Sequence, residues 1–427
     1  MPASCHHGRS LVKLRVCFVT HVEVSIAPRW LRVPVRRLRL TALALLATLV
    51  VWHTYDLSAP GLTDRSSRLK APDFLQFYTY GSLVAANRAD ALYDADAHAA
   101  MARRVVSPEL TLSEFRPNYS PVIAWLAVPL ASLPFGAAMA VFAAVSAAAY
   151  CAALVLLWSV TTKIRADAVT TALVAVAWPT LFAVLRYGQI SAFSLLVVAA
   201  ATVAAAHGRT WLAGAALGLL VYKPNLLLGP GLILLAAGQW RLVAGLILGA
   251  GSEIALDLAL AGPDVMRQYL ATLLALARQP ELVQFYPAES HSLRGFVRLL
   301  VPWSPLVNAT GVVALPLAAW IGARIWRTHR DFRPRWAALV LASLVASPHV
   351  LTYDLVLLAV PIVMLVDWWL DLGARRPSGV SGWGLTLLYF GAWPGTFIAR
   401  LYHVQLSTVG MVWLLWLLAQ APREDRA

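Results

Sequence analysis

The sequence predicts an all-α, polytopic integral membrane protein, and three observations lead to this prediction. Of its 427 residues, 59% are hydrophobic and only 13% are charged, whereas a soluble protein of this length carries about 25% charge. Apolar runs of about 15–24 residues recur along the chain and are typical of membrane-spanning helices rather than of a β-barrel. Most basic residues flank these runs, so the formal net charge of +14 indicates membrane topology and not nucleic-acid binding.

Twelve spans are expected within a single membrane domain that covers residues 38–420. Residues 1–37 are expected to form a disordered cytoplasmic tail, of which 1–28 fit either a tail or an over-extended translation start, and residues 421–427 a second cytoplasmic tail. No cleavable signal peptide is evident, because the Arg-rich stretch from Arg29 to Arg39 leads into a span that resembles an uncleaved anchor. The expected spans are 38–55, 136–160, 168–185, 190–206, 210–222, 226–238, 241–260, 305–326, 336–349, 353–370, 380–398 and 404–420.

The apolar run over residues 119–133 is the hardest to assign. It has about 15 residues and contains Pro121, Pro129 and Pro134, so it is short for a span. If it lies along the outer membrane surface, the basic clusters between spans all fall on the cytoplasmic side with the N-terminus, as the positive-inside rule favours. These clusters are Lys163/Arg165, Arg209, Arg241, Arg324 to Arg335 and Arg375/Arg376.

This topology leaves two long outer loops, residues 56–135 and 261–304. Both contain aromatic and basic residues in helical patterns, which is typical of helices that lie at the membrane interface. In the first loop an amphipathic stretch begins at Phe74, directly after Asp73. In the second loop, residues 264–277 predict a short helix.

Three short outer connections carry most of the remaining polar residues. They are Arg186-Tyr187-Gly188-Gln189, Tyr222-Lys223-Pro224-Asn225 and Ser347-Pro348-His349-Val350-Leu351-Thr352-Tyr353-Asp354. Cations such as Arg186 and Lys223 are costly at the membrane edge and usually face a cavity. Together with Asp73, His291 and Arg294, they are expected to line one outward-facing site.

These residue types suit the transfer of a group from a phosphate-bearing lipid. Asp73 is a candidate base for an acceptor hydroxyl. The candidate cations for the lipid phosphate are Arg186, Lys223 and Arg294. A sugar needs amide, phenol and imidazole hydrogen bonds. The candidates for these substrate contacts are Gln189, Tyr187, His291 and His349, with Tyr353 and Asp354 in the same substrate-binding set.

The motifs of other enzyme classes are missing from the sequence. It contains no paired-carboxylate motif, HExxH, P-loop or GxSxG, and no soluble nucleotide-binding domain. A lipid-linked sugar therefore fits better as donor than a nucleotide sugar. The cysteines Cys5, Cys17 and Cys151 have no metal-binding spacing and imply no disulfide framework. Neither a metal nor a cofactor is expected, and the lipid-linked sugar itself is the co-substrate.

Several short motifs follow one another in an order that resembles a known family. They are Asp73-Phe74 before an aromatic helix and Leu92-Tyr93-Asp94, Tyr119-Ser120-Pro121 with Pro129-Leu130, Tyr187-Gly188-Gln189, and Ala213-Gly214 to Lys223-Pro224. Over about residues 38–370 the chain is similar to the family 87 glycosyltransferases, which are integral-membrane enzymes of the GT-C superfamily.

The resemblance implies an inverting transferase that takes a sugar, often mannose, from a polyprenyl-phosphate donor on the outer face of the bacterial inner membrane. A glycan or glycolipid would be the acceptor, and membrane lipids would surround the enzyme. The resemblance also implies that Asp73 is the catalytic acidic residue and that residues 119–133 lie along the membrane surface. Members of the family often carry Ser-Pro followed by Trp and His late in the chain. Here that segment reads Ser347-Pro348-His349 with Tyr353-Asp354, which leaves the donor sugar open.

Most of these residues could also have a purely structural role. Asp73 is a favoured helix N-cap, and Lys223 before Pro224 could satisfy carbonyls freed by a helix break. The structural roles open to the rest are headgroup contact for Arg186, helix–helix hydrogen bonding for Gln189, ordinary loop positions for His291 and Arg294, and pairing of His349 and Asp354 with each other or with another outer residue.

A secondary transporter or lipid flippase is the alternative function. Glu253 and Asp257 are four residues apart on one helix face and, with Asp354, could couple ions to transport. For Asp257, however, a structural contact near the outer end of its span is the favoured interpretation. Such transporters are built from repeats with matching broken helices, and one break, around Lys223, has no counterpart in the sequence. The long first outer loop also favours the enzyme.

Overall fold

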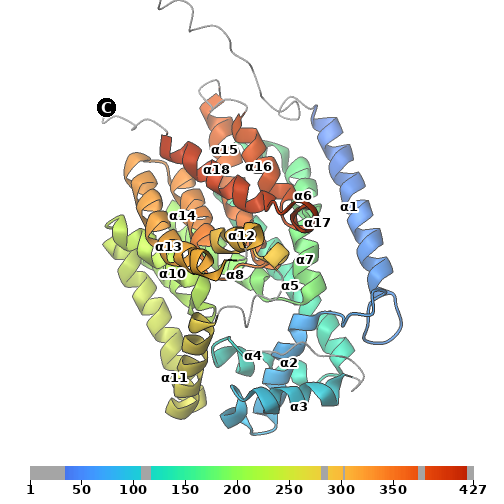
Figure 1. Ribbon diagram of the computed structural model, residues 1–427. Helices are drawn as coiled ribbons and strands as arrows, with labels where there is room; N and C mark the ends of the chain where they lie inside the picture. Colours follow the sequence, from blue (N-terminus) through green and yellow to red (C-terminus); the bar gives the residue numbers. More distant parts are fainter. Residues whose placement is uncertain (1–33, 107–116, 280–286, 302, 374–379, 421–427) are drawn as a thin grey trace, which may run out of the picture.

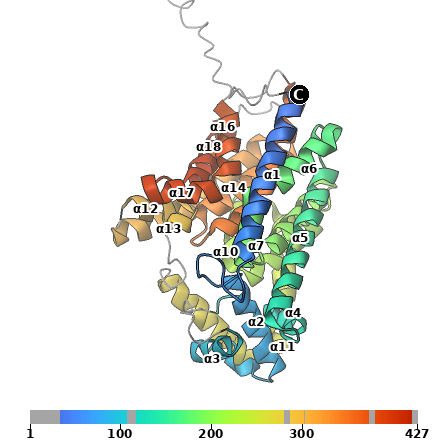
Figure 2. The same cartoon turned by 90° about the vertical axis from the view of Figure 1, so that its right-hand side faces the viewer.

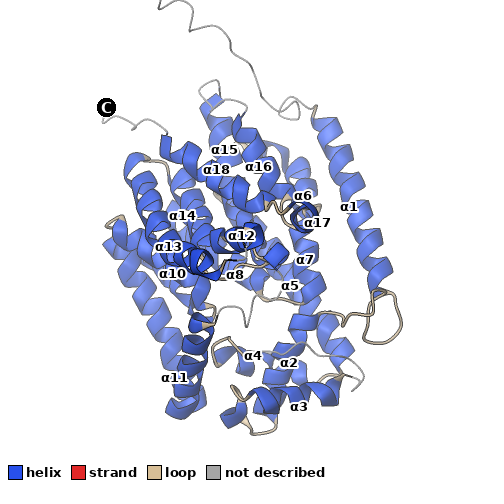
Figure 3. Cartoon of the chain, in the orientation of Figure 1, coloured by secondary structure: helices blue, strands red, loops and turns tan. Residues whose placement is uncertain are grey.

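The computed structural model describes residues 34–106, 117–279, 287–301, 303–373 and 380–420. Within these ranges every named element is a helix, as Figure 3 shows, which confirms the expected all-α class. The first 33 residues of the expected N-terminal tail and the whole C-terminal tail lie outside the described residues. The first helix begins at Val35.

The helices follow one another along the chain in Figure 1. The α-helices are α1 (Val35–Leu57), α2 (Pro72–Ala85), α3 (Ala95–Val105), α4 (Val122–Ala131), α5 (Phe135–Ser159), α6 (Ala168–Val176), α7 (Pro179–Tyr187), α8 (Ser191–Ala206), α9 (Thr210–Gly218), α10 (Pro224–Ala236), α11 (Trp240–Arg278), α12 (Leu293–Leu300), α13 (Ser304–Thr328), α14 (Phe332–Ala346), α15 (Ala359–Leu372), α16 (Val380–Phe390), α17 (Trp393–Tyr402) and α18 (Leu406–Gln420). Short 3-10 helices are η2 (Ala89–Ala91), η3 (Ile164–Asp167), η4 (Leu219–Tyr222), η6 (Pro287–Glu289) and η7 (Thr352–Leu358).

Five of the described helices are long and apolar enough to cross a bilayer. They are α1, α5, α11, α13 and the continuous stretch Thr352–Leu372 formed by η7 and α15. The number rises to seven if each of two bent pairs is one span, namely Ile164–Val176 with Pro179–Tyr187 and Pro394–Tyr402 with Leu406–Gln420. The structure thus supports a helical membrane protein but not the expected count of twelve spans.

Helix length explains most of this difference. The expected spans 190–206, 210–222, 226–238 and 336–349 do contain helices, but α8, α9, α10 and α14 have 16, 9, 13 and 15 residues. At 1.5 Å per residue, even the longest of the four is about 24 Å, less than the roughly 30 Å of a hydrocarbon core. Apolar composition alone does not separate a helix that faces lipid from one that is surrounded by protein.

Helices α2, α3 and α4 lie together at one end of the molecule, beside the tip of α11 (Figures 1 and 2). We call this the α2–α4 end. Helix α4, which occupies the apolar run 119–133, has ten residues and is therefore too short, at about 15 Å, to cross a bilayer. It packs tightly on α2, because a Cβ added to Gly81 would lie 2.5 Å from the carbonyl oxygen of Ala127.

Helix α11 contains the short helix expected at residues 264–277. The helix breaks at Gly262, whose backbone angles (φ 79°, ψ 170°) are not helical, immediately before Pro263. The residues after the break continue to Arg278, and Tyr269 among them packs on Tyr93 of the α2–α4 end, with ring centroids 5.3 Å apart. The expected short helix is therefore confirmed.

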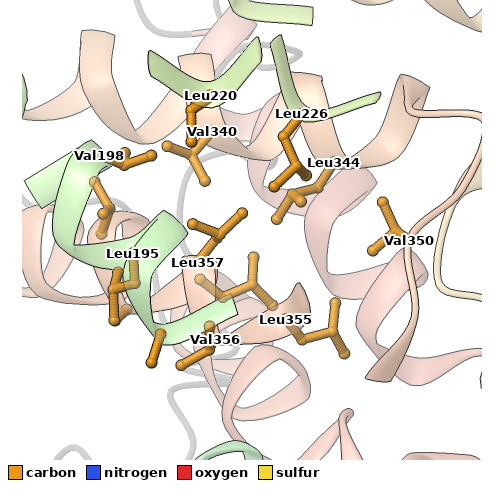
Figure 4. Packing of buried hydrophobic residues seen from close by; sticks show 14 of the residues in the cluster. Leu195, Val198, Leu220, Leu226, Val340, Leu344, Val350, Leu355, Val356 and Leu357 are labelled. Carbon is orange, nitrogen blue, oxygen red and sulfur yellow. The ribbon is translucent and has the colours of Figure 1, made fainter. Parts of the chain in front are cut away.

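Helix α14 forms the centre of the bundle. Residues 336–346 are all buried, as expected for a helix that is apolar around its whole circumference. Figure 4 shows Val340 and Leu344 of α14 in a cluster with side chains of α8 and η7. The other labelled members are Leu195, Val198, Leu220, Leu226, Val350, Leu355, Val356 and Leu357. By contrast, large apolar side chains on α1, α5, α11 and α13 are exposed, as lipid-facing helices require.

The opposite end of the molecule, where α1 begins, carries several of the basic residues. Arg39 on α1 pairs with Asp167 at 2.7 Å. The guanidinium of Arg333 pairs with Asp367 at 2.8 Å, and Asp367 also accepts the backbone N–H groups of residues 162–164 at 2.7–3.1 Å. Two of the expected cytoplasmic clusters, Lys163/Arg165 and Arg324 to Arg335, thus share one end with the start of α1, while Arg375/Arg376 lies outside the described residues. The side of the membrane on which this end lies stays a prediction.

Small residues let α9 and α11 approach one another at backbone distance. Gly214 and Gly218 on α9 face Gly245 and Gly249 on α11, which is the small-xxx-small pattern of membrane helix pairs. A Cβ added to Gly249 would lie 2.1 Å from the carbonyl oxygen of Ala215. Since α9 leads through η4 directly to Lys223, this contact also fixes where that lysine enters the bundle.

The substitution Gly249→Ala is expected to destabilise the protein, because its new methyl group would collide with the backbone of α9. Overpacking of this kind costs about 1–3 kcal/mol. The matched control is Gly251→Ala on the same helix, where an added Cβ meets no atom within 4 Å. Thermal unfolding in detergent should show a lower midpoint for Gly249→Ala and an equal or higher one for Gly251→Ala. Equal midpoints for the two variants would contradict this packing.

Candidate active site

Asp73 is the second residue of α2 and is hydrogen-bonded to Gln189, in the short segment between α7 and α8. The backbone N-cap of α2 is Ala71, in a left-handed conformation, and α2 has no side-chain cap, so Asp73 does not act as the N-cap. Its Oδ2 accepts a hydrogen bond from Nε2 of Gln189 at 2.8 Å. Tyr353 of η7 forms a further hydrogen bond with the same carboxylate. Asp73 is partly buried, so its environment is largely protein.

Gln189 holds its amide in one orientation through three hydrogen bonds. While Nε2 binds Asp73, Oε1 accepts the hydroxyl of Tyr119 at 3.0 Å and the N–H of Ile190 at 3.2 Å. Both amide ends are thus satisfied, and Nε2 must point at the carboxylate. Gln189 therefore acts as a fixed hydrogen-bond donor to Asp73.

Gly188 permits the close approach of α2 to Gln189. It ends α7 with a left-handed backbone (φ 68°), and an added Cβ would lie 2.6 Å from Cβ of Phe74 and 2.8 Å from Cβ of Ala71. Both the conformation and the space favour glycine at this position. The sequence Gly188-Gln189 thereby brings a donor against the first turn of α2.

Lys223 and Asp354 form a buried ion pair next to this group. The Lys223 ammonium contacts Oδ1 of Asp354, and both side chains are almost fully buried. Asp354 also accepts the hydroxyl of Ser191 at 2.7 Å and the N–H of Leu351 at 3.2 Å. The ammonium lies 5.2 Å from the ring centroid of Tyr353. The ring of Tyr353 thus connects the Lys223–Asp354 pair to Asp73.

Burial raises the pKa of Asp73 to about 6. The hydrogen bond from Gln189, the charge of Lys223 and the hydrogen bond with Tyr353 all lower this pKa, while the negative charge of Asp354 raises it. A carboxyl group with such a pKa is mostly ionised at neutral pH and is more basic than an ordinary surface aspartate.

Five of the residues predicted from the sequence are therefore brought together, namely Asp73, Gln189, Lys223, Tyr353 and Asp354. Tyr187 is adjacent, since its ring centroid lies 5.6 Å from that of Tyr353. Its hydroxyl donates to Glu289 at 3.1 Å, and Glu289 also pairs with Arg400 at 2.8 Å. Glu289 belongs to the second long outer loop expected from the sequence, residues 261–304. Its bond to Tyr187 thus places part of this loop beside the cluster.

Arg186 is engaged elsewhere. Its Nε lies 3.1 Å from Oδ2 of Asp56, and its guanidinium also pairs with Asp64. Both acids precede α2 in the chain, and all three side chains are largely buried. The phosphate-binding role expected for Arg186 stays a prediction, and the structure gives this side chain two carboxylate partners.

His291 joins three elements through both of its ring nitrogens. Nδ1 lies 2.7 Å from the hydroxyl of Ser407, and Nε2 lies 3.0 Å from the hydroxyl of Thr352. Burial lowers the pKa of His291 to about 3, so the ring is neutral at physiological pH. Both ring nitrogens therefore have partners, and His291 holds its own segment, in the second long outer loop, against η7 and α18. Its expected contact with a sugar stays a prediction.

His349 lies close enough to Lys223 and to Arg294 for their charges to act on its ring. Burial lowers the pKa of His349 to about 4; the negative charge of Asp354 opposes this effect, and the charges of Lys223 and Arg294 add to it. Among the described residues, Nδ1 of His349 is buried without a hydrogen-bond partner. Arg294 donates to Asn308 at 3.3 Å. The neutral imidazole of His349 thus has one ring nitrogen with no hydrogen-bond partner among the described residues.

Glu253 and Asp257, the acids of the transporter alternative, have structural partners. Glu253 accepts the hydroxyl of Ser120 at 3.1 Å, and Asp257 accepts the N–H of Val122 at 2.5 Å. The carboxylate of Asp257 thus satisfies a free amide at the start of α4, as the sequence suggested for this residue. Asp354, the third acid, pairs with Lys223. Each of the three carboxylates thus has a partner within the fold.

Sequence reasoning missed three residues that shape this cluster. Tyr119 was noted as part of a motif, but its bond to Gln189 joins positions 70 residues apart. Ser191 lies two residues after Gln189, and this nearness was its one signal. Glu289 lies in the second long outer loop, and no motif around it in the sequence indicated a role. Within the described residues, no group of three or more His, Cys, Asp or Glu side chains is placed to hold a metal ion.

The comparison with protein families gives one match. The sequence model described as Glycosyltransferase family 87 matches residues 118–351, which is more than half of the chain. This range contains Gln189 and Lys223, while Asp73 precedes it and Asp354 follows it. No curated protein and no solved structure matches the chain.

Proposed function

Since the chain belongs to glycosyltransferase family 87 and is therefore a membrane glycosyltransferase, we propose that it moves a hexose such as mannose from a polyprenyl-phosphate donor to a hydroxyl of a glycan or glycolipid. The observation that supports this proposal is the single cluster of polar groups around Asp73. A candidate base is linked through Tyr353 to the buried cation Lys223, so proton removal and phosphate stabilisation are possible in one place.

The proposed reaction is one inverting displacement. The ionised carboxylate of Asp73 takes the proton of the acceptor hydroxyl, and the acceptor oxygen attacks the anomeric carbon of the donor sugar. The bond from that carbon to the phosphate oxygen breaks, and polyprenyl phosphate leaves with the electron pair. Gln189 holds the carboxylate at a fixed angle during this transfer.

Lys223 is the proposed cation for the leaving phosphate. An ammonium group has three N–H donors, and Asp354 occupies one direction around it. The remaining donors can bind a phosphate oxygen in a site with little water, where a charge interaction is strongest. The neutral ring of His349 offers a further hydrogen bond to the same region.

The proposed site faces outward from the bacterial inner membrane, as in the GT-C arrangement implied by the sequence. It lies toward the α2–α4 end, away from the end where α1 begins and where Arg39 and Arg333 lie. By the positive-inside rule, the basic end is the cytoplasmic one. A polyprenyl-phosphate donor would then enter from the outer leaflet.

A donor panel tests the proposed function. Purified protein is incubated with radiolabelled polyprenyl-phosphate hexoses or with nucleotide sugars, together with a glycolipid or glycan acceptor. The expected result is transfer from at least one polyprenyl-phosphate hexose and none from nucleotide sugars. Transfer from a nucleotide sugar alone would contradict the proposed donor. Uptake of the lipid into vesicles with no sugar transfer would favour the transporter alternative.

The pH profile is expected to report the ionisation of Asp73. A base acts only when ionised, so kcat/KM should be retained above the pKa of about 6 and fall tenfold per pH unit below it. Because the hydrogen bond from Gln189 lowers this pKa, Gln189→Leu should move the acidic limb to higher pH. The measurement is kcat/KM between about pH 4.5 and 8 for both proteins. A flat profile, or a shift to lower pH in the variant, would exclude Asp73 as the titrating base.

A further inference from the structure

Arg186 lies among more negative than positive charge. Its guanidinium pairs with both Asp56 and Asp64, and the side chains of the three residues are 16%, 9% and 0% exposed. Two buried carboxylates already neutralise the single cation. A lipid phosphate at Arg186 would have to compete with two carboxylates that already contact the guanidinium, whereas the Lys223 ammonium contacts one. The environment of Arg186 therefore does not favour binding of an anion.

Asp64 also makes several of the hydrogen bonds within the connection between α1 and α2. Its Oδ1 accepts the N–H groups of Ser66 and Arg68 at 2.8 and 2.9 Å, and its own N–H donates to the carbonyl of Arg68 at 2.8 Å. The ammonium of Lys70 binds the carbonyls of residues 59 and 61 at 2.5 and 2.9 Å. Hydrogen bonds between its own residues thus hold the connection together, and Arg186 pairs with Asp64 in the middle of it.

The same connection leads into Asp73. It ends at Ala71, whose left-handed backbone (φ 47°) turns the chain into α2. Ala71 packs on Gly188, and the next residue of that segment, Gln189, donates to Asp73. Residues 186–189 therefore contact the connection by an ion pair, the start of α2 by packing, and the carboxylate by a hydrogen bond.

From this geometry we propose that Arg186, with Asp64 and Asp56, is a positioning residue that sets Asp73 against Gln189. The proposal rests on the proposed role of Asp73 as the base. Arg186 contacts neither substrate nor reacting atoms. It acts by fixing the connection that carries Asp73, and the competing role is direct binding of the donor phosphate.

Steady-state kinetics separate these two roles. Arg186→Met and Asp64→Asn should each lower kcat by about 10- to 100-fold, since small displacements of a reacting group are costly, while KM for the donor stays within about twofold. The double variant should be no worse than the more severe single variant, because the two side chains act as one unit. A tenfold higher donor KM and weaker inhibition by polyprenyl phosphate in Arg186→Met, with kcat unchanged, would overturn the proposal.

Two measures keep the test decisive. Arg39→Met is the matched control, because Arg39 also joins α1 to a later segment, through Asp167 and Thr170, but at the other end of the molecule. Its kinetics should match the wild type. If Arg186→Met does not fold, Arg186→Lys, which keeps the charge but lacks the forked donors for two carboxylates, replaces it under the same criteria.

Hydrogen exchange tests the positioning role without any activity. In Arg186→Met, backbone amides of residues 62–74 should exchange faster than in the wild type, while those of α5 should not change. Unchanged exchange over residues 62–74 would overturn the proposal, whatever the kinetics show. If the wild type transfers no sugar from any donor, the proposed function fails, and this exchange result still decides whether Arg186 holds the connection.

Discussion

Replacing Asp73 by asparagine is expected to abolish sugar transfer while leaving the protein folded. The amide has the shape of the carboxylate, and its oxygen can still accept the hydrogen bond from Gln189. It cannot take a proton from the acceptor hydroxyl, and general-base catalysis contributes about 10²–10⁴ to a rate. The transfer rate should therefore fall by about 10³-fold or more, with an unchanged unfolding midpoint.

The control for this variant is Asp90→Asn. Asp90 lies in η2, just after α2, but its side chain is 79% exposed and it is not part of the cluster. This variant should transfer sugar at the wild-type rate. Full activity in Asp73→Asn would remove the proposed base. Lost activity together with an unfolded protein would point to a structural role for the carboxylate.

Removal of the Lys223 charge is expected to have the second large effect, on both stability and activity. In Lys223→Met, the carboxylate of Asp354 is left fully buried without its cation, and breaking a buried pair on one side costs about 3–5 kcal/mol. The leaving phosphate also loses its proposed counter-charge, so the transfer rate should fall by about 10²–10³-fold. Thermal unfolding and donor kinetics measure the two effects separately.

A double variant separates stability from catalysis. In Lys223→Met with Asp354→Asn, the buried charge is gone, and the amide can still accept the bond from Ser191. The unfolding midpoint should recover most of the loss, whereas the transfer rate should stay low. Recovery of both properties would show that the cation is needed for folding alone.

The helices were largely predictable from the sequence, but their number of membrane crossings was not. Apolar runs marked the positions of α8, α10 and α14, because burial in protein and burial in lipid select the same residue types. Residues 336–346 are enclosed by protein, and nothing in their composition distinguishes them from a lipid-facing span. The charge pattern, by contrast, correctly grouped Arg39 and Arg333 with the end where α1 begins.

The cluster around Asp73 was partly predictable, since costly polar residues in apolar surroundings were its signal. Lys223 and Gln189 were found in this way and lie with Asp73. The partners of Arg186 could not be found, because Asp64 is 122 positions away in the sequence. The close contact of α9 with α11 was not predicted, because glycines four residues apart, such as Gly245 and Gly249, do not say which helix they face.

The anomeric configuration of the product tests the central claim most directly. The purified protein is supplied with a polyprenyl-phosphate hexose of known configuration and an acceptor, and the product is analysed by NMR while released polyprenyl phosphate is counted. One displacement assisted by Asp73 predicts an inverted linkage and one polyprenyl phosphate per sugar transferred. A product with retained configuration, formed equally well by Asp73→Asn, would contradict the account.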